Sequence, residues 1–139
     1  MLKILIVDDS LIIRKKITKI LEKLGHEVVF SAQNGQEAID SYKKYKPDLV
    51  TMDITMPDMD GITAVKHIIA EDVNAKIVMV TSHGQEDMVI KSIQSGAVGY
   101  LLKPITEDKM AQSIGEVFIE YAVEPDDEEL DLLEDEFKV

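Results

Sequence analysis

Reactive side chains directly follow four short apolar segments of this chain. They are Asp8 and Asp9 after residues 4–7, Asp53 after 49–52, Thr81 after 77–80, and Lys103 after 98–102. If these segments are strands of one parallel sheet, their carboxyl ends share one edge, which is where open α/β sheets bind ligands. Three carboxylates brought together repel one another, and the pKa of at least one rises unless a cation joins them. The spacing therefore predicts a small polar site that holds a cation.

The residue types favour magnesium as the cation and phosphoryl transfer as the chemistry. The sequence has no cysteine and only three histidines, none of them suitably paired, so the ligands are oxygens. Few, hard oxygen ligands suit Mg²⁺ that keeps several waters. With an ammonium and a hydroxyl beside it, such an ion clamps a multiply charged tetrahedral oxyanion. One aspartate could itself accept a phosphoryl group, since carboxylates act as nucleophiles.

Each of these residues also has an ordinary structural explanation when it is taken alone. An aspartate pair after a strand often caps the next helix. Asp53 could be a turn residue before Pro57, Thr81 a capping hydroxyl, and Lys103 a solvated lysine. Their occurrence together at successive strand ends favours a shared site over four separate accidents.

Five apolar segments alternate with segments of helical periodicity. The apolar segments are residues 4–7, 27–30, 49–52, 77–80 and 98–102. The last helical stripe, predicted as one helix, consists of Met110, Ile114, Val117, Phe118 and Tyr121. A β-α unit repeated five times predicts an α/β fold with a doubly wound, five-stranded parallel sheet. The flavodoxin-like strand order 2-1-3-4-5 is expected, and it makes the four strands with reactive ends neighbours.

Composition limits the class of protein and divides the chain in two. The 139 residues suit one domain, and the net charge of −12 argues against nucleic acid. No apolar run approaches the roughly 20 residues of a membrane span, so a cytoplasmic protein is expected. Residues 1–123 are predicted to form the domain, and 124–139 an acidic extension with nine acids and one base. Leu130, Leu133 and Phe137 share one helical face of that extension, which is either a short helix or a disordered tail.

The chain resembles the response-regulator receiver domains, in particular the CheY-like family. The resemblance covers residues 1 to about 121. It is carried by Asp8-Asp9, by the run Asp53-Ile54-Thr55-Met56-Pro57-Asp58-Met59-Asp60-Gly61, by Thr81 and by Lys103-Pro104. Since no second domain is recognised, the chain is similar to the stand-alone chemotaxis regulators rather than to transcription factors.

The resemblance implies a role for each matching residue. Asp53 is the implied phosphoacceptor, and Mg²⁺ is held by Asp53, directly by Asp9, through water by Asp8, and by the carbonyl of Thr55. Thr81 and Lys103 are expected to bind the phosphoryl group, and Tyr100 matches the aromatic switch position. Thr55 and His83 occupy the positions that tune phosphoryl lifetime. The Lys103–Pro104 bond is expected to be cis, an isomer that X-Pro bonds tolerate. The two remaining histidines, His26 and His67, are expected at the surface.

The implied function is phosphorylation-activated signalling and not catalytic turnover. A chemotaxis-type histidine kinase is the expected donor, and a phosphatase is a further expected partner of this monomer. The output face comprises the helix around 88–93, the strand 98–102 and the helix from 110, and the flagellar motor switch protein is its expected target. A phosphorelay shuttle, or a regulator of another output, is the alternative.

Other classes of site fit the residues less well. An FMN site needs a loop rich in glycine and hydroxyl groups after the first strand. Here Asp8-Asp9-Ser10 is anionic and would repel a phosphate without a metal. Magnesium phosphatases with an aspartate nucleophile carry Asp-x-Asp at this place, whereas the second aspartate here is adjacent to the first. A purely structural interaction module remains as the alternative if the acidic cluster binds no metal.

Overall fold

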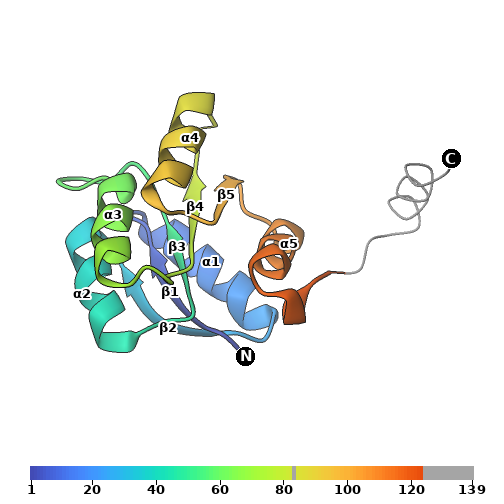
Figure 1. Ribbon diagram of the computed structural model, residues 1–139. Helices are drawn as coiled ribbons and strands as arrows, with labels where there is room; N and C mark the ends of the chain where they lie inside the picture. The colour runs from blue at the N-terminus through green and yellow to red at the C-terminus, as the bar shows by residue number, and fades with distance from the viewer. Residues whose placement is uncertain (83, 124–139) are drawn as a thin grey trace, which may run out of the picture.

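The computed structural model describes residues 1–82 and 84–123, so the predictions for His83 and for 124–139 lie outside the described residues. Within this part, five strands and five α-helices alternate along the chain (Figure 1). The strands are β1 (Lys3–Val7), β2 (Glu27–Ala32), β3 (Leu49–Met52), β4 (Ile77–Thr81) and β5 (Gly99–Leu102). All pair in parallel in the order β2-β1-β3-β4-β5, so the predicted α/β fold and strand order are confirmed.

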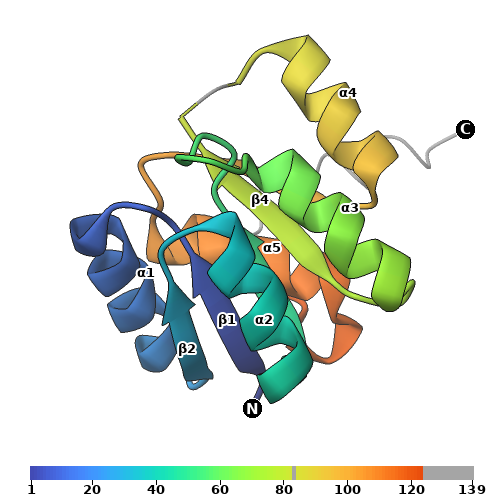
Figure 2. The ribbon, with the colours of Figure 1, turned by 90° about the vertical axis from the view of Figure 1, so that its left-hand side faces the viewer.

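The helices cover both faces of this sheet (Figure 2). They are α1 (Leu11–Lys23), α2 (Gly35–Tyr45), α3 (Gly61–Glu71), α4 (Glu86–Ser95) and α5 (Glu107–Val117). Ile17 and Leu21 of α1 pack with Met110 and Ile114 of α5 in one core cluster. Apolar residues of α2, α3 and α4 pack on the opposite face, where the second cluster lies. The central strands β1, β3 and β4 are buried nearly throughout, which explains their unbroken apolar sequence.

The end of α5 differs from the sequence prediction. One helix was expected through Tyr121, but α5 ends at Val117, and a short 3₁₀ helix, η1 (Ile119–Tyr121), follows. Phe118 adopts an extended conformation between the two, with φ of −123°. The chain then folds back over Gly115, where an added Cβ would lie 2.8 Å from the Cα of Ala122. Val117, Phe118 and Tyr121 still pack against the same core cluster.

His26 is buried, so its expected surface position was wrong. Only 6% of the residue is exposed, and its Nδ1 accepts a hydrogen bond of 3.1 Å from the backbone N–H of Leu2. Its ring meets that of Tyr121 edge-on, with the centroids 4.9 Å apart. His67 is exposed, as expected. In the described part of the chain, no helix is long and apolar enough to span a membrane.

Candidate functional site

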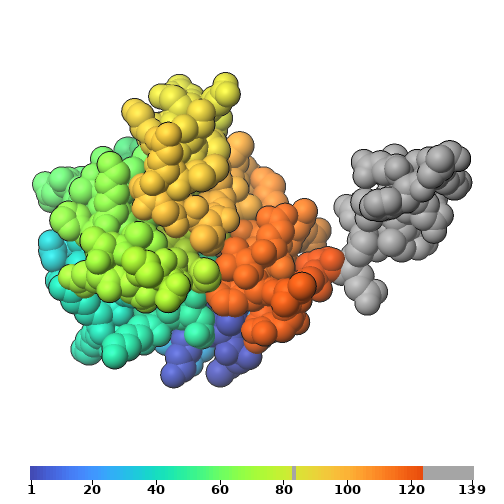
Figure 3. Space-filling view, viewed as in Figure 1, coloured from blue at the N-terminus to red at the C-terminus, as the bar shows by residue number. Residues whose placement is uncertain are grey.

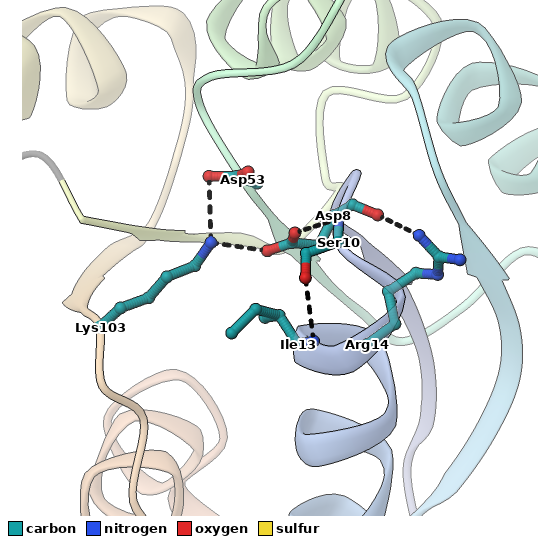
Figure 4. Close-up of polar contacts among 6 residues, drawn as sticks. All are labelled: Asp8, Ser10, Ile13, Arg14, Asp53 and Lys103. Atoms are coloured by element: carbon teal, nitrogen blue, oxygen red, sulfur yellow. Dashed lines mark hydrogen bonds and ion pairs between the residues drawn. The ribbon is translucent and has the colours of Figure 1, made fainter.

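The turn after β1 fixes one carboxylate and exposes the next. Asp8 is 1% exposed, and its Oδ1 accepts a hydrogen bond of 2.9 Å from the backbone N–H of Ser10. The Ser10 hydroxyl caps α1 by accepting from the N–H of Ile13 at 3.3 Å. The guanidinium of Arg14 donates to the Asp8 carbonyl at 2.7 Å (Figure 4). These bonds hold both the side chain and the backbone of Asp8, while Asp9 faces solvent.

Asp53 lies at the end of β3, where its backbone is approached closely by that of residue 61. Only glycine at residue 61 permits this approach. Its N–H donates to the carbonyl of Val7 at 2.9 Å, which joins the ends of β1 and β3. The loop that follows returns, and the N–H of Gly61 donates to the carbonyl of Ile54 at 2.7 Å. A Cβ on Gly61 would collide with the carbonyl oxygen of Asp53. The close approach of two backbone segments therefore positions Asp53.

Thr81 and Lys103 complete the edge from β4 and β5. Thr81 is fully buried, and its carbonyl accepts a hydrogen bond of 2.8 Å from the N–H of Lys103. The Lys103–Pro104 bond is cis, as predicted. The Nζ of Lys103 lies 2.8 Å from Oδ2 of Asp8 and 3.6 Å from Oδ1 of Asp53 (Figure 4). A single ammonium thus contacts carboxylates from two neighbouring strands.

The environment of Asp53 raises its pKa from 3.8 to about 6. Burial of the carboxylate is the largest cause, since it disfavours the charged form. The negative charge of Asp8 adds to the shift and that of Asp9 adds a little more, whereas the ammonium of Lys103 opposes it. The single ammonium of Lys103 does not neutralise three carboxylates. The site therefore keeps an excess of negative charge that a bound cation would offset.

The donor atoms at this edge fit a hard divalent cation. One oxygen each from Asp8, Asp9 and Asp53 can be chosen so that all lie within 4.8 Å of one another. Oδ2 of Asp8 is buried and, apart from its ion pair with Lys103, forms no hydrogen bond to a described residue. Because all three ligands are oxygens, Mg²⁺ or a similar ion suits the site better than a thiophilic metal. This is the only such cluster in residues 1–82 and 84–123.

Two other residues singled out in the sequence, Thr55 and Tyr100, lie in different surroundings. Thr55 is exposed and borders a cavity of about 490 Å³ between α3 and α4, together with Lys66 and Lys91. Tyr100 packs against the core cluster beneath α2, α3 and α4, and burial raises the pKa of its hydroxyl. That hydroxyl is buried without a hydrogen-bond partner in the described chain. The hydroxyl of the residue at the aromatic switch position is therefore already buried in this structure.

The sequence patterns missed two residues that shape the site. Arg14 of α1 reaches back to the Asp8 carbonyl. Its position six residues after Asp8 is the usable signal, because the first turns of a helix that follows a strand lie beside the end of that strand. Gly61 belongs to the family run, but no local pattern reveals its contact with Asp53.

Comparison with known families identifies the class of protein. The family model described as the response regulator receiver domain matches residues 4–115, which is most of the chain. The chain belongs to this family of two-component signalling domains.

Similar proteins place the chain, within the receiver-domain family, among the CheY-like response regulators. The chemotaxis protein CheY of Bacillus subtilis is 51% identical over 112 residues, which cover 81% of this chain and 93% of that protein. CheY of Thermotoga maritima is 44% identical over 115 residues, covering 83% and 96% of the two chains. Among solved structures, the CheX-CheY-BeF3-Mg²⁺ complex of Borrelia burgdorferi has a TM-score of 0.81 and 38% identity, covering 84% of this chain and 88% of the other. The chain is thus a CheY-like receiver domain, consistent with phosphorylation-dependent signalling in chemotaxis.

Proposed function

We propose that this receiver domain accepts a phosphoryl group on Asp53 and transmits the change to a partner of the chemotaxis machinery. The observation that carries the proposal is the convergence of Asp8, Asp53 and Lys103 at one edge of the sheet, with Nζ of Lys103 2.8 Å and 3.6 Å from the two carboxylates. An ammonium held between two carboxylates is placed to contact a phosphoryl group attached to either one. Asp53 is favoured as the acceptor because Asp8 is tied by the backbone of Ser10.

The proposed reaction is the transfer of one phosphoryl group to a carboxylate oxygen. An oxygen of Asp53 attacks the phosphorus of a phosphohistidine or an acyl phosphate, and an O–P bond forms while the bond to the donor's leaving group breaks. The leaving group keeps the bonding electron pair. Lys103 balances negative charge on the phosphoryl oxygens, and the buried hydroxyl of Thr81 donates to one of them. Hydrolysis of the aspartyl phosphate later restores Asp53, so each cycle modifies the protein itself.

The acidic cluster is the proposed Mg²⁺ site. Asp8, Asp9 and Asp53, with the backbone carbonyl of Thr55, would hold the ion, which when bound neutralises negative charge on the phosphoryl group in transit. The raised pKa of Asp53 supports this assignment, because burial first, and then the negative charge of Asp8, disfavour the ionised carboxylate, and a bound cation would favour it. Thr55 and His83 are proposed to set the lifetime of the phosphorylated form.

The proposed output face lies on α4, β5 and α5. Ile90, Ile93, Val98 and Leu102 are each between 44% and 60% exposed there. Figure 3 shows α4 standing out from the body of the molecule. Exposed apolar side chains of this size at one end of the sheet favour a protein partner. The flagellar motor switch protein is the proposed target, a histidine kinase the donor, and a CheX-like protein a further partner, by analogy with the Borrelia complex. Tyr100 on β5 is the proposed link between this face and the site.

The acceptor assignment is tested by treating the protein with acetyl phosphate and measuring its intact mass. The wild type should gain one phosphoryl group in the presence of Mg²⁺ and none in the presence of EDTA. Asp53→Asn should gain none under either condition. Asp58→Asn is a matched control, because it makes the same change at an exposed position in the same loop, and it should label like the wild type. Equal labelling of wild type and Asp53→Asn would refute the assignment.

The output assignment is tested separately by binding. Protein loaded with beryllofluoride and Mg²⁺ should bind a peptide of a flagellar switch protein more tightly than the unloaded protein does. Ile93→Glu should remove this binding and leave phosphorylation intact, because residue 93 is 60% exposed and lies on α4 away from the carboxylates. Binding instead to a histidine phosphotransfer domain would support the phosphorelay alternative.

A further inference from the structure

The outer face of α1 combines positive charge with exposed apolar side chains. We call the α1 face the stripe formed by Leu11, Ile12, Lys15, Lys16 and Lys19, all of them exposed. Leu11 is 55% exposed and Ile12 78% exposed. The residues follow one another at helical spacing and so share one side of the helix. This side faces away from the sheet, because Ile17 and Leu21 fill the core on the other side.

Charge on the α1 face is uncompensated within the described chain. Helix α1 carries five basic residues and a single acid, Glu22, although residues 1–123 as a whole are acidic, with 18 acids and 14 bases. Lys23 is paired with Glu107 at 3.2 Å, and Arg14 contacts the Asp8 carbonyl. Lys15, Lys16 and Lys19 form no ion pair with any described residue. The α1 face is therefore free to attract an anionic ligand.

A groove beside the α1 face gives an apolar group a place to bind. It has a volume of about 420 Å³ and is lined by residues of α1 and β2. Helix α1 and strand β2 lie side by side at one edge of the molecule (Figure 2). Six residues of α1 form one wall, among them Leu11, Lys15, Lys19 and the acid Glu22, and Ser31 of β2 lies on the other side. A ligand that carries both acidic and large apolar side chains fits this combination better than a nucleic acid would, since the net charge of the domain is negative.

The chain itself supplies such a ligand. Residues 124–139 contain nine acids, one base, and the large apolar residues Leu130, Leu132, Leu133 and Phe137. The other surface rich in exposed apolar groups, on α4, β5 and α5, presents the acids Glu86 and Asp87 in the first turn of α4 and Asp108 in that of α5. Repulsion from those acids makes the α1 face the better complement.

The described chain ends near the C-terminal end of α1. The Tyr121 hydroxyl accepts a hydrogen bond of 2.6 Å from the amino group of Met1, and its ring contacts His26. The N–H of His26 in turn donates to the carbonyl of Leu21 in the last turn of α1, at 3.0 Å. Helix α1 is about 20 Å long, and an extended segment of the 16 residues after Val123 reaches up to about 50 Å. The acidic segment can therefore reach every residue of the α1 face.

We propose that the acidic segment 124–139 docks on the α1 face of its own domain. The carboxylates contact Lys15, Lys16 and Lys19, and one or more of the apolar side chains enter the groove beside Leu11. Each exposed ion pair is weak, but the tether supplies an effective concentration on the order of mM, so several weak contacts suffice. The contact leaves the surface of α4, β5 and α5 open.

The test uses the full chain, whose lack of cysteine permits a single spin label. Val139→Cys carrying a nitroxide is studied by ¹⁵N NMR. At low salt the amides of α1 should lose intensity relative to the reduced, diamagnetic label, and those of α3 and α4 should not. Raising the ionic strength to 0.5 M shortens the Debye length to about 4 Å and should restore the α1 signals.

Charge reversal separates specific docking from general attraction. Lys15→Glu, Lys16→Glu and Lys19→Glu made together should lower the docking equilibrium by about tenfold and remove the broadening. The matched control reverses the charge of three exposed lysines on the other side of the molecule, Lys66, Lys76 and Lys91. It should leave the broadening of the α1 amides unchanged. The double variant Leu133→Asn, Phe137→Ser retains every charge and should reduce the broadening of the α1 amides.

Several outcomes would overturn the proposal. Broadening that persists after reversal of the α1 lysines, or that falls on α4, β5 and α5, would place the segment elsewhere. Uniform weak broadening would show that it does not dock. Broadening of an unlabelled ¹⁵N protein mixed with a spin-labelled ¹⁴N protein would assign the contact to a second copy or to another acidic chain in solution.

Discussion

Removing the charge of Asp53 should stabilise the metal-free protein. In the fold its pKa is raised from 3.8 to about 6, so folding costs free energy whenever the carboxylate is ionised. A shift of this size corresponds to about 3 kcal/mol. Lys103 is 17% exposed and Asp9 faces solvent, so screening reduces the expected effect to roughly 1–2 kcal/mol. Asp53→Asn keeps the shape of the side chain and should gain that amount at pH 8 in EDTA.

The pH dependence gives the sign of the effect. The unfolded carboxylate ionises near pH 3.8 and the folded one near pH 6, so the wild type loses stability as the pH rises between these values. The advantage of Asp53→Asn should therefore be complete above about pH 6 and should disappear toward pH 4. Urea unfolding followed by circular dichroism at several pH values measures it. For a chain of this size the melting temperature should rise by about 3–8 °C.

Magnesium should reverse the order of the two proteins. An ion that binds only the folded state stabilises it in proportion to the logarithm of its concentration over the dissociation constant. The wild type has three carboxylates with which to bind Mg²⁺, and Asp53→Asn has two, so Mg²⁺ should stabilise the wild type more. Asp58→Asn, at an exposed residue in the left-handed region (φ 69°) that asparagine tolerates, should change neither stability nor the response to Mg²⁺. An Asp53→Asn protein less stable than wild type in EDTA at pH 8 would refute this reasoning.

Three further predictions concern the site and its surroundings. Gly61→Ala should lower the free energy of unfolding, measured by urea titration, by about 3 kcal/mol and slow labelling of Asp53, because the added Cβ would collide with the Asp53 carbonyl. Gly84→Ala is the control: its Cβ meets only a flexible leucine side chain, so it should cost far less in the same titration. Lys103→Met should raise the pKa of Asp53 further, as measured by carboxyl ¹³C NMR, since its ammonium now lowers that pKa; an unchanged value would contradict the contact. Burial, with the amino-terminal charge, lowers the pKa of His26 below 6.5. Its unfolded form therefore binds more protons, and the wild type should lose more stability than His26→Gln as the pH falls from 7 to 5; parallel curves would rule this out.

The sequence alone determined the order of the elements and the candidate residues. Strands β1, β3 and β4 read as apolar runs because both faces of each are buried, and that burial requires apolar residues at consecutive positions. The reactive residues could be found because the carboxyl ends of parallel strands meet at one edge, so the position in sequence at which each strand stops also gives a position in space. Both signals are local, and a local signal can be read without coordinates.

Only the tertiary structure decided how these residues differ from one another. Asp8 and Asp9 are adjacent and chemically identical, yet one is buried against Lys103 and the other is exposed. The contact of Gly61 with Asp53, the burial of His26 and the end of α5 at Val117 likewise depend on segments that meet across the fold. Such contacts are set by the close packing of segments distant in sequence, and the periodicity of one segment carries no information about its distant neighbour.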